Sequence, residues 1–171
     1  VGIRMDPVSG VQLDGVKVQV GNAFIGGLGI KSLCLSYLRG GSTFVAGCQA
    51  PSLGKAAAGK PPFMTCATDT EKDRWDGALA IILPTASKTE LGVWGGTSDG
   101  KFSHGGAYAD NLGTALPLAP GVFVDRIAFG VCVQPPPFKL KGEIGVAFGP
   151  DFNGHKAAKV NGWLEYTDSY N

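Results

Sequence analysis

The residue types of a serine hydrolase lie close together in one part of the chain. Ser103 is followed directly by His104, and Asp110 comes shortly after them. Nucleophilic catalysis needs the serine hydroxyl within hydrogen-bond reach of its base. Neighbouring side chains on a strand point to opposite faces of the sheet, so a strand here would keep Ser103 away from His104. The chain also has no G-x-S-x-G turn, and we expect no serine catalysis.

Two glutamates in the C-terminal part are candidates for glycoside hydrolysis, which needs two carboxylates across a cleft. Glu143 and Glu165 each occupy a polar position in an alternating apolar and polar pattern. This position is typical of a solvent-facing side chain on a strand. We therefore predict that the protein is not an enzyme. A secreted glycoside hydrolase with this carboxylate pair is an alternative, which a concave groove around both glutamates would favour.

Acidic residues that could bind calcium gather in one short segment. They are Asp69, Glu71, Asp73 and Asp76. Carboxylate oxygens on tight loops are the ligands that calcium prefers, although ordinary turns also favour Asp and Asn. A second oxygen-rich turn at 151–154 lacks the downstream glutamate of an EF-hand loop. We predict no cofactor, with a structural calcium ion at the first segment as the alternative.

Four cysteines indicate disulfide bonds. They are Cys34, Cys48, Cys66 and Cys132, and none lies in a C-x-x-C pair. An even number in a glycine-rich chain favours two disulfides and an oxidising compartment, so we predict an extracellular, cell-surface or particle-surface location. We predict one bridge from Cys48 to Cys66, closing the loop between them, and one from Cys34 to Cys132, joining two strands. Four buried free thiols are the alternative.

Exposed aromatic rings would be the chemistry of a carbohydrate-binding module, because a flat ring stacks on a sugar. Trp94 lies on a hairpin face that otherwise carries glycines and small residues. Either another element packs on those glycines and buries the ring, or the ring is an exposed platform. The other candidates are Trp163, Tyr166 and Tyr170. At least two coplanar exposed rings would indicate a sugar binder.

Period-two alternation predicts the strands that must position these residues. We expect strands at 11–24, 30–38, 77–83, 122–133, 138–148 and 158–167, with a hairpin at 91–109. The hairpin turns at Asp99-Gly100, a pair that favours the type I′ turn. A two-residue turn would place His104 and Tyr108 beside Leu91 and Val93, away from Trp94. In the strand at 30–38, Leu33, Leu35 and Tyr37 are expected to face the core.

The pattern predicts one all-β domain over residues 1–171, with little or no helix and a Pro- and Gly-rich loop at about 49–72. We expect an antiparallel two-sheet sandwich or jelly-roll-like arrangement. A β-solenoid-like repeat is the alternative, because four strands begin with a glycine after a large apolar residue. The segments between those starts do not align, however.

Composition narrows the function. The chain is 44% hydrophobic and 17% charged, with a net charge of +1 and no basic run, which excludes nucleic-acid partners. Its longest apolar run, residues 78–83, is far too short to cross a bilayer, so we expect no membrane insertion. Low charge and 27 glycines indicate a non-enzymatic extracellular structural or binding module, for surface adhesion or self-assembly into a particle or fibre. Its partners would be copies of itself or other subunits, and a glycan in the carbohydrate-binding alternative.

Overall fold

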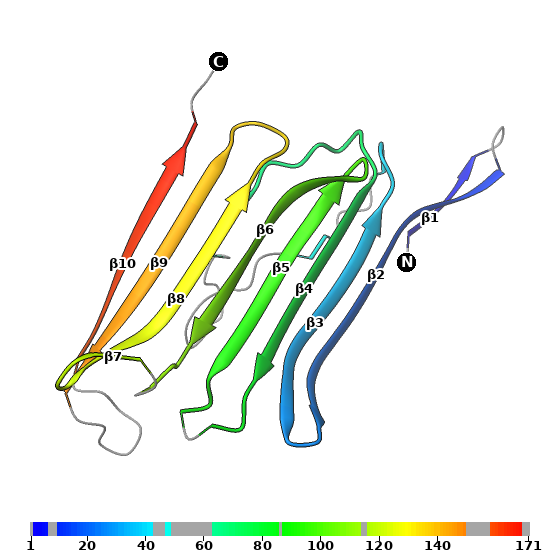
Figure 1. The fold of residues 1–171 in the computed structure, drawn as a ribbon. Coiled ribbons are helices and arrows are strands. Elements are labelled where there is room, and N and C mark those ends of the chain that lie inside the picture. The colour runs from blue at the N-terminus through cyan, green and yellow to red at the C-terminus, as the bar shows by residue number, and fades with distance from the viewer. Residues whose placement is uncertain are drawn as a thin grey trace.

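The computed structural model describes residues 2–6, 10–42, 47–48, 63–85, 87–113, 116–149 and 158–168. Within these ranges it contains ten strands and no helix (Figure 1). The strands are β1 (Gly2–Asp6), β2 (Gly10–Ile25), β3 (Leu28–Leu38), β4 (Arg74–Ile82), β5 (Glu90–Ser98), β6 (Lys101–Asp110), β7 (Pro117–Ala119), β8 (Val122–Cys132), β9 (Lys139–Phe148) and β10 (Ala158–Thr167). The prediction of an all-β antiparallel fold is confirmed. No helix in the described ranges is long and apolar enough to cross a membrane.

The strands form one sheet, whereas we expected two packed sheets. Its order is β1-β2-β3-β4-β5-β6-β8-β9-β10, and the short β7 pairs with β8. Every pair is antiparallel, and the sheet is not closed (Figure 1). Each strand pairs with a strand next to it along the chain, and the described strands form no second sheet. This meander also differs from the stacked coils of a repeat solenoid.

The strand positions agree closely with the alternation pattern. The strands expected at 122–133, 138–148 and 158–167 correspond to β8, β9 and β10. Asp99 and Gly100 join β5 to β6 with φ values of 52° and 72°. A type I′ turn needs positive φ at both central residues, so the predicted turn chemistry is present.

A bulge in the β5–β6 hairpin changes which residues share a face. Gly96 pairs with His104, whereas Thr97 pairs with Phe102, so Ser103 is the extra residue. An extra residue reverses the alternation beyond it. His104 and Tyr108 therefore lie on the same face as Trp94, and our expectation that they lie beside Leu91 and Val93 was wrong.

One face of the sheet is partly covered by the segment that precedes β4. Phe63 and Met64 from this segment pack on Trp94, Tyr108, Ala128 and Cys132, in the buried core cluster. The ring centroids of Phe63 and Trp94 are 5.8 Å apart, with the rings edge to face. We call this side of the sheet the polar face, because charged side chains surround the cluster, and the opposite side the open face.

The four cysteines form two disulfides, but the predicted partners were wrong. Cys34 is bonded to Cys48, and Cys66 to Cys132, with Cα–Cα distances of 5.8 Å and 5.5 Å. Cys34 lies on β3 and Cys132 on β8, with three strands between them. At a strand spacing of about 4.8 Å, their backbones are roughly 19 Å apart, well beyond the reach of a disulfide.

Candidate functional site

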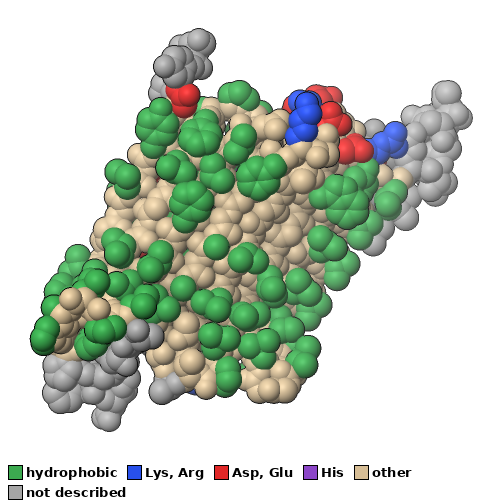
Figure 2. Space-filling model, viewed as in Figure 1, with side chains coloured by type: hydrophobic (Ala, Val, Ile, Leu, Met, Phe, Trp, Pro, Cys, Tyr) green, Lys and Arg blue, Asp and Glu red, His purple; other side chains and the backbone are tan. Residues whose placement is uncertain are grey.

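The open face is apolar from one side of the sheet to the other. The residues that point to this face can be followed through the strand pairing from Val16 on β2 to Tyr166 on β10, and none of them carries a charged side chain. Figure 2 shows hydrophobic side chains spread over this face, with Lys, Arg, Asp and Glu only near its upper margin. Large apolar side chains on it are more than one-third exposed: Val18, Val20, Leu33, Leu35, Trp75, Val93, Phe102, Ile127, Phe129, Ile144, Val160, Leu164 and Tyr166.

Aromatic rings line one end of the open face. Tyr37 and Trp75 are paired across β3 and β4, with ring centroids 4.9 Å apart and planes tilted by 44°. Tyr166 lies at the same end of the sheet, with its ring 6.4 Å from that of Phe138. Phe102, at the start of β6, is half exposed at this end as well. The rings therefore form a row across several strands.

Charged and hydrogen-bonding groups lie just beyond these rings. Asp73 accepts hydrogen bonds from the Tyr37 hydroxyl at 3.0 Å and from the Gly40 backbone N–H at 2.8 Å. Asp69 forms an ion pair with Lys72 at 3.2 Å. The backbone N–H of Glu71 and the Lys72 ammonium lower the pKa of Asp69 below its usual value. Along the strands, the surface thus changes from apolar to aromatic and then to charged.

On the polar face, charges are paired with one another. Arg126 donates to Asp110 at 3.0 Å and to Glu143 at 2.8 Å, and all three side chains are largely buried. Lys31 pairs with Glu90 at 2.7 Å, and Lys159 with Asp125 at 2.6 Å. Glu90 also accepts a short hydrogen bond from the hydroxyl of Tyr108. These pairs allow charged residues to lie against a partly buried surface.

The structure corrects one premise about Ser103 and His104. Because Ser103 is the bulged residue, its Oγ lies 3.1 Å from His104 Nδ1, although adjacent strand residues would point apart. The Ser103 hydroxyl is buried and donates to the Gln134 carbonyl oxygen at 2.8 Å. Asp110 is bonded to Arg126, and the carboxylate near His104 Nε2 is Asp76, at 3.7 Å. This arrangement offers no exposed nucleophile.

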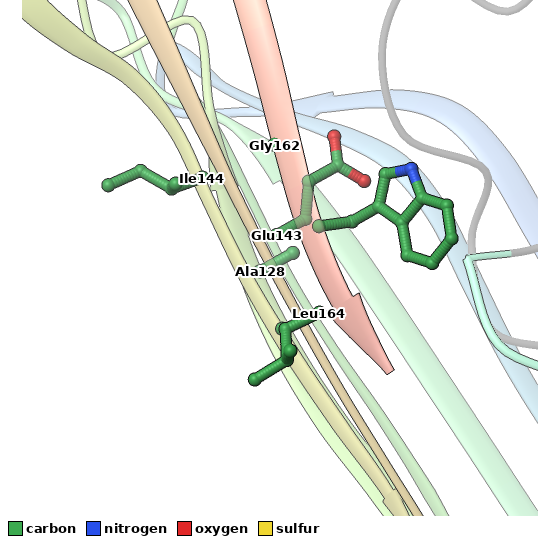
Figure 3. Close-up of a pocket in the computed structure, with 7 residues that line it drawn as sticks. Ala128, Glu143, Ile144, Gly162 and Leu164 are labelled. Atoms are coloured by element: carbon green, nitrogen blue, oxygen red, sulfur yellow. The ribbon is translucent and has the colours of Figure 1, made fainter. Parts of the chain in front are cut away.

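The two glutamates lie on the same face but do not flank one cleft. Glu143 is paired with Arg126, and Glu165 with Lys141 at 3.5 Å. A shallow groove of about 450 Å³ lies beside Glu143, and Glu165 does not line it. In Figure 3, Glu143 points to one side of the strands, whereas Ile144 and Leu164 point to the other. The groove thus brings no second carboxylate to Glu143.

The predicted calcium ligands are not brought together. Asp69 is bonded to Glu71 and Lys72, and Asp73 to Tyr37 and Gly40. Asp76 accepts from Arg74 at 2.9 Å. Across the described part of the chain, no group of three His, Cys, Asp or Glu residues could hold a metal ion. The turn at 151–154 lies outside the described residues.

The predicted sugar platforms are also separated. Trp94 is only 6% exposed, so it is a core residue and not a platform. Trp163 is 70% exposed on the polar face, and Tyr166 is 54% exposed on the open face. Tyr170 lies outside the described residues. The sequence analysis missed the Tyr37–Trp75 pair, because it took Tyr37 as a core residue; a pairing of the two strands would have revealed it.

No family model matches the chain, and neither a curated protein nor a solved structure is significantly similar to it.

Proposed function

We propose that the protein is a non-enzymatic structural module that assembles edge to edge with copies of itself. The observation that carries this proposal is a pair of matching open edges. β1 pairs with β2 only up to Gly15, and no other described strand pairs with the outer edge of β2 over residues 16–25. At the other end of the sheet, β10 pairs with β9 on one side only, over all ten of its residues. Open strand edges present unpaired N–H and C=O groups that pair readily with another chain.

The directions of these two edges fit one another. Eight long strands, β2 to β6 and β8 to β10, follow one another in antiparallel pairs. Because their number is even, β2 and β10 run in opposite directions. The β10 edge of one copy can therefore pair antiparallel with the β2 edge of the next, with both open faces on the same side of the combined sheet. Such a head-to-tail contact forms a ring if its rotation closes and a filament if it does not.

The side chains of β10 leave its edge accessible. Natural sheets protect exposed edges with proline, bulges or charged side chains. β10 has no proline, and its register with β9 is continuous from Ala158 to Thr167. Its charged residues, Lys159 and Glu165, are paired with Asp125 and Lys141 within the same chain. β10 therefore has neither proline nor a bulge, and its two charged side chains are engaged by partners within the chain.

We further propose that the module works outside the cell or on a cell or particle surface. The two disulfides are compatible with this location, since such bonds persist in oxidising compartments. The carbohydrate-binding alternative has weaker support, because the ring pairs described on the open face are not coplanar: the planes of Tyr37 and Trp75 are tilted by 44°, and those of Phe138 and Tyr166 by 60°.

Photo-cross-linking tests the edge contact. A benzophenone amino acid would replace Trp163 on β10, in an equal mixture of ¹⁴N- and ¹⁵N-labelled protein. We expect cross-links between chains, from position 163 to peptides within residues 16–25. The matched control carries the same label at Trp75, which is also exposed but lies on the interior strand β4, and it should give no link between chains to residues 16–25. Links confined to one chain, or links from 163 to β10 of another copy, would overturn the proposal.

A further inference from the structure

We infer that the open face lies against the acyl chains of a lipid bilayer. The inference rests on the proposed edge assembly, because unpaired backbone groups are not tolerated in hydrocarbon. The polar face, which carries the paired charges and the packed segment around Phe63, would be turned away from the lipid.

The size and chemistry of the open face require an apolar cover. From β2 to β10 the sheet spans seven strand spacings, roughly 34 Å, and the strands are roughly 30 Å long, so the face measures about 1,000 Å² in projection. The largest apolar patch on a typical monomer in water is about 300–600 Å². The register positions described on this face carry no charge to limit association in water.

The strand lengths match the thickness of a bilayer. β3, β4, β5, β6, β8, β9 and β10 are 9 to 11 residues long. A strand that crosses the hydrocarbon layer, about 30 Å thick, needs about 9–11 residues when tilted. The apolar alternation on β9 continues over this whole length, and on β8 it resumes after a bulge at Asp125, so that Ile127, Phe129 and Ile144 are exposed near the middle.

The order of side chains along the strands also matches a bilayer. Tyr and Trp favour the interface between hydrocarbon and water, where a ring has one apolar side and one hydrated side. Tyr37, Trp75 and Tyr166 lie at one end of the open face, and the Tyr37 hydroxyl is bonded to Asp73 beyond it. A gradient from apolar through aromatic to charged groups is therefore built into this end of the sheet.

A second copy packed face to face fits less well. Protein interfaces have about one hydrogen bond per 100–200 Å², so about 1,000 Å² would carry about five to ten. On the open face, the side chains able to form hydrogen bonds, such as Thr97, Tyr37 and Tyr166, lie at one end of the strands. Its centre offers only aliphatic and Phe side chains, alanine and glycine. Hydrocarbon needs no hydrogen-bonding partners, whereas a protein surface does.

Fluorescence quenching by brominated lipid tests this inference. The protein would be reconstituted into phosphatidylcholine vesicles with bromine on the acyl chains, and compared with unbrominated vesicles. We expect bromine to quench the tryptophan emission, and Trp75→Phe to lose most of that quenching. Trp163→Phe is the matched control, since Trp163 is even more exposed than Trp75 but lies on the polar face, and it should keep the quenching. Quenching lost in Trp163→Phe but kept in Trp75→Phe, or no quenching at all, would overturn the inference.

A second pair of variants guards against misfolding of Trp75→Phe. Ile127→Lys places a charge near the middle of the open face and should abolish vesicle association. Asn161→Lys places the same charge on the polar face of β10 and should leave association unchanged. Equal loss in both variants would contradict the inference.

Cross-linking in the same vesicles separates the two proposals. Trp75 quenching without a link from 163 to residues 16–25 would refute copy-to-copy pairing and support lipid contact. The link without quenching would support the assembly and refute lipid contact. A discrete dimer in water with Trp75 buried, and no quenching in vesicles, would replace the lipid with a second copy.

Discussion

Replacement of Gly106 by alanine tests how the polar face is packed. The six-membered ring of Trp94 lies directly over Gly106, with Trp94 Cη2 2.6 Å from the position that a Cβ would occupy. A Cβ there would also overlap the carbonyl oxygen of Phe129, which belongs to the neighbouring strand β8. That oxygen is part of the backbone and cannot move aside as the end of a flexible side chain could.

The expected magnitude follows from two opposing effects. Overpacking in a core costs about 1–3 kcal/mol, and a rigid obstacle places Gly106→Ala in the upper part of that range. Loss of glycine freedom in the unfolded chain offsets about 0.4–1 kcal/mol of the cost. We therefore expect a net destabilisation of about 2 kcal/mol, which lowers the urea midpoint by about 1 M for a typical m-value.

Gly162→Ala is the matched control. Gly162 also lies in a strand, but no atom lies within 4 Å of the position its Cβ would take. This variant should match the wild type or be more stable by about 0.5 kcal/mol. Urea unfolding followed by tryptophan fluorescence measures both. Equal midpoints for the two variants would refute the claim that Trp94 is held in a space that only glycine leaves open.

Two further predictions concern covalent and ionic links. Replacing Cys66 and Cys132 with serine should lower the free energy of unfolding by about 4 kcal/mol, and replacing Cys34 and Cys48 should lower it by about 3 kcal/mol. These values follow from the chain-entropy relation for loops of 66 and 14 residues. Urea unfolding of each variant measures the difference, and a larger loss of stability from the Cys34–Cys48 replacement would contradict the prediction. Only the first replacement should shift Trp94 emission to the red, because Cys66 anchors the segment that covers this ring. Arg126→Met should lower the free energy of unfolding by about 3–5 kcal/mol, because Asp110 and Glu143 share its guanidinium in a largely buried site. Lys72→Met, at an exposed ion pair, should lower it by less than about 1 kcal/mol. Similar losses of stability in both variants would show that Arg126 does not form a buried ion pair.

Alternation located the strands well because it depends only on local geometry. Residues 158–167 alternate over a full strand and residues 126–132 over most of one, and both strands appear at the predicted positions. The same pattern shows which residues share a face, but not which face is covered. Leu33 and Leu35 were expected in the core, yet they are 40% and 53% exposed on the open face.

Pairings between distant segments were not predictable from the sequence. The Cys66–Cys132 bridge depends on where β8 lies relative to the segment before β4, and neither spacing nor composition contains that information. The Ser103–His104 contact depends on a bulge that interrupts an otherwise regular pattern. The lipid contact that we propose would depart from the expectation of no membrane insertion. That expectation used the length of continuous apolar runs, whereas alternation spreads apolar side chains over every second residue.

The short strand β1 has a consequence for the accuracy of assembly. It occupies the outer edge of β2 through Gly15, so an incoming strand can begin to pair only at Val16. From there to Ile25 the free stretch is as long as β10. In the edge assembly that we propose, β1 would therefore limit the register: a partner strand that slid further along β2 would collide with it, and one that stopped short would leave part of its own edge unpaired. A chain without β1 would lose this limit and could join its neighbour in more than one alignment.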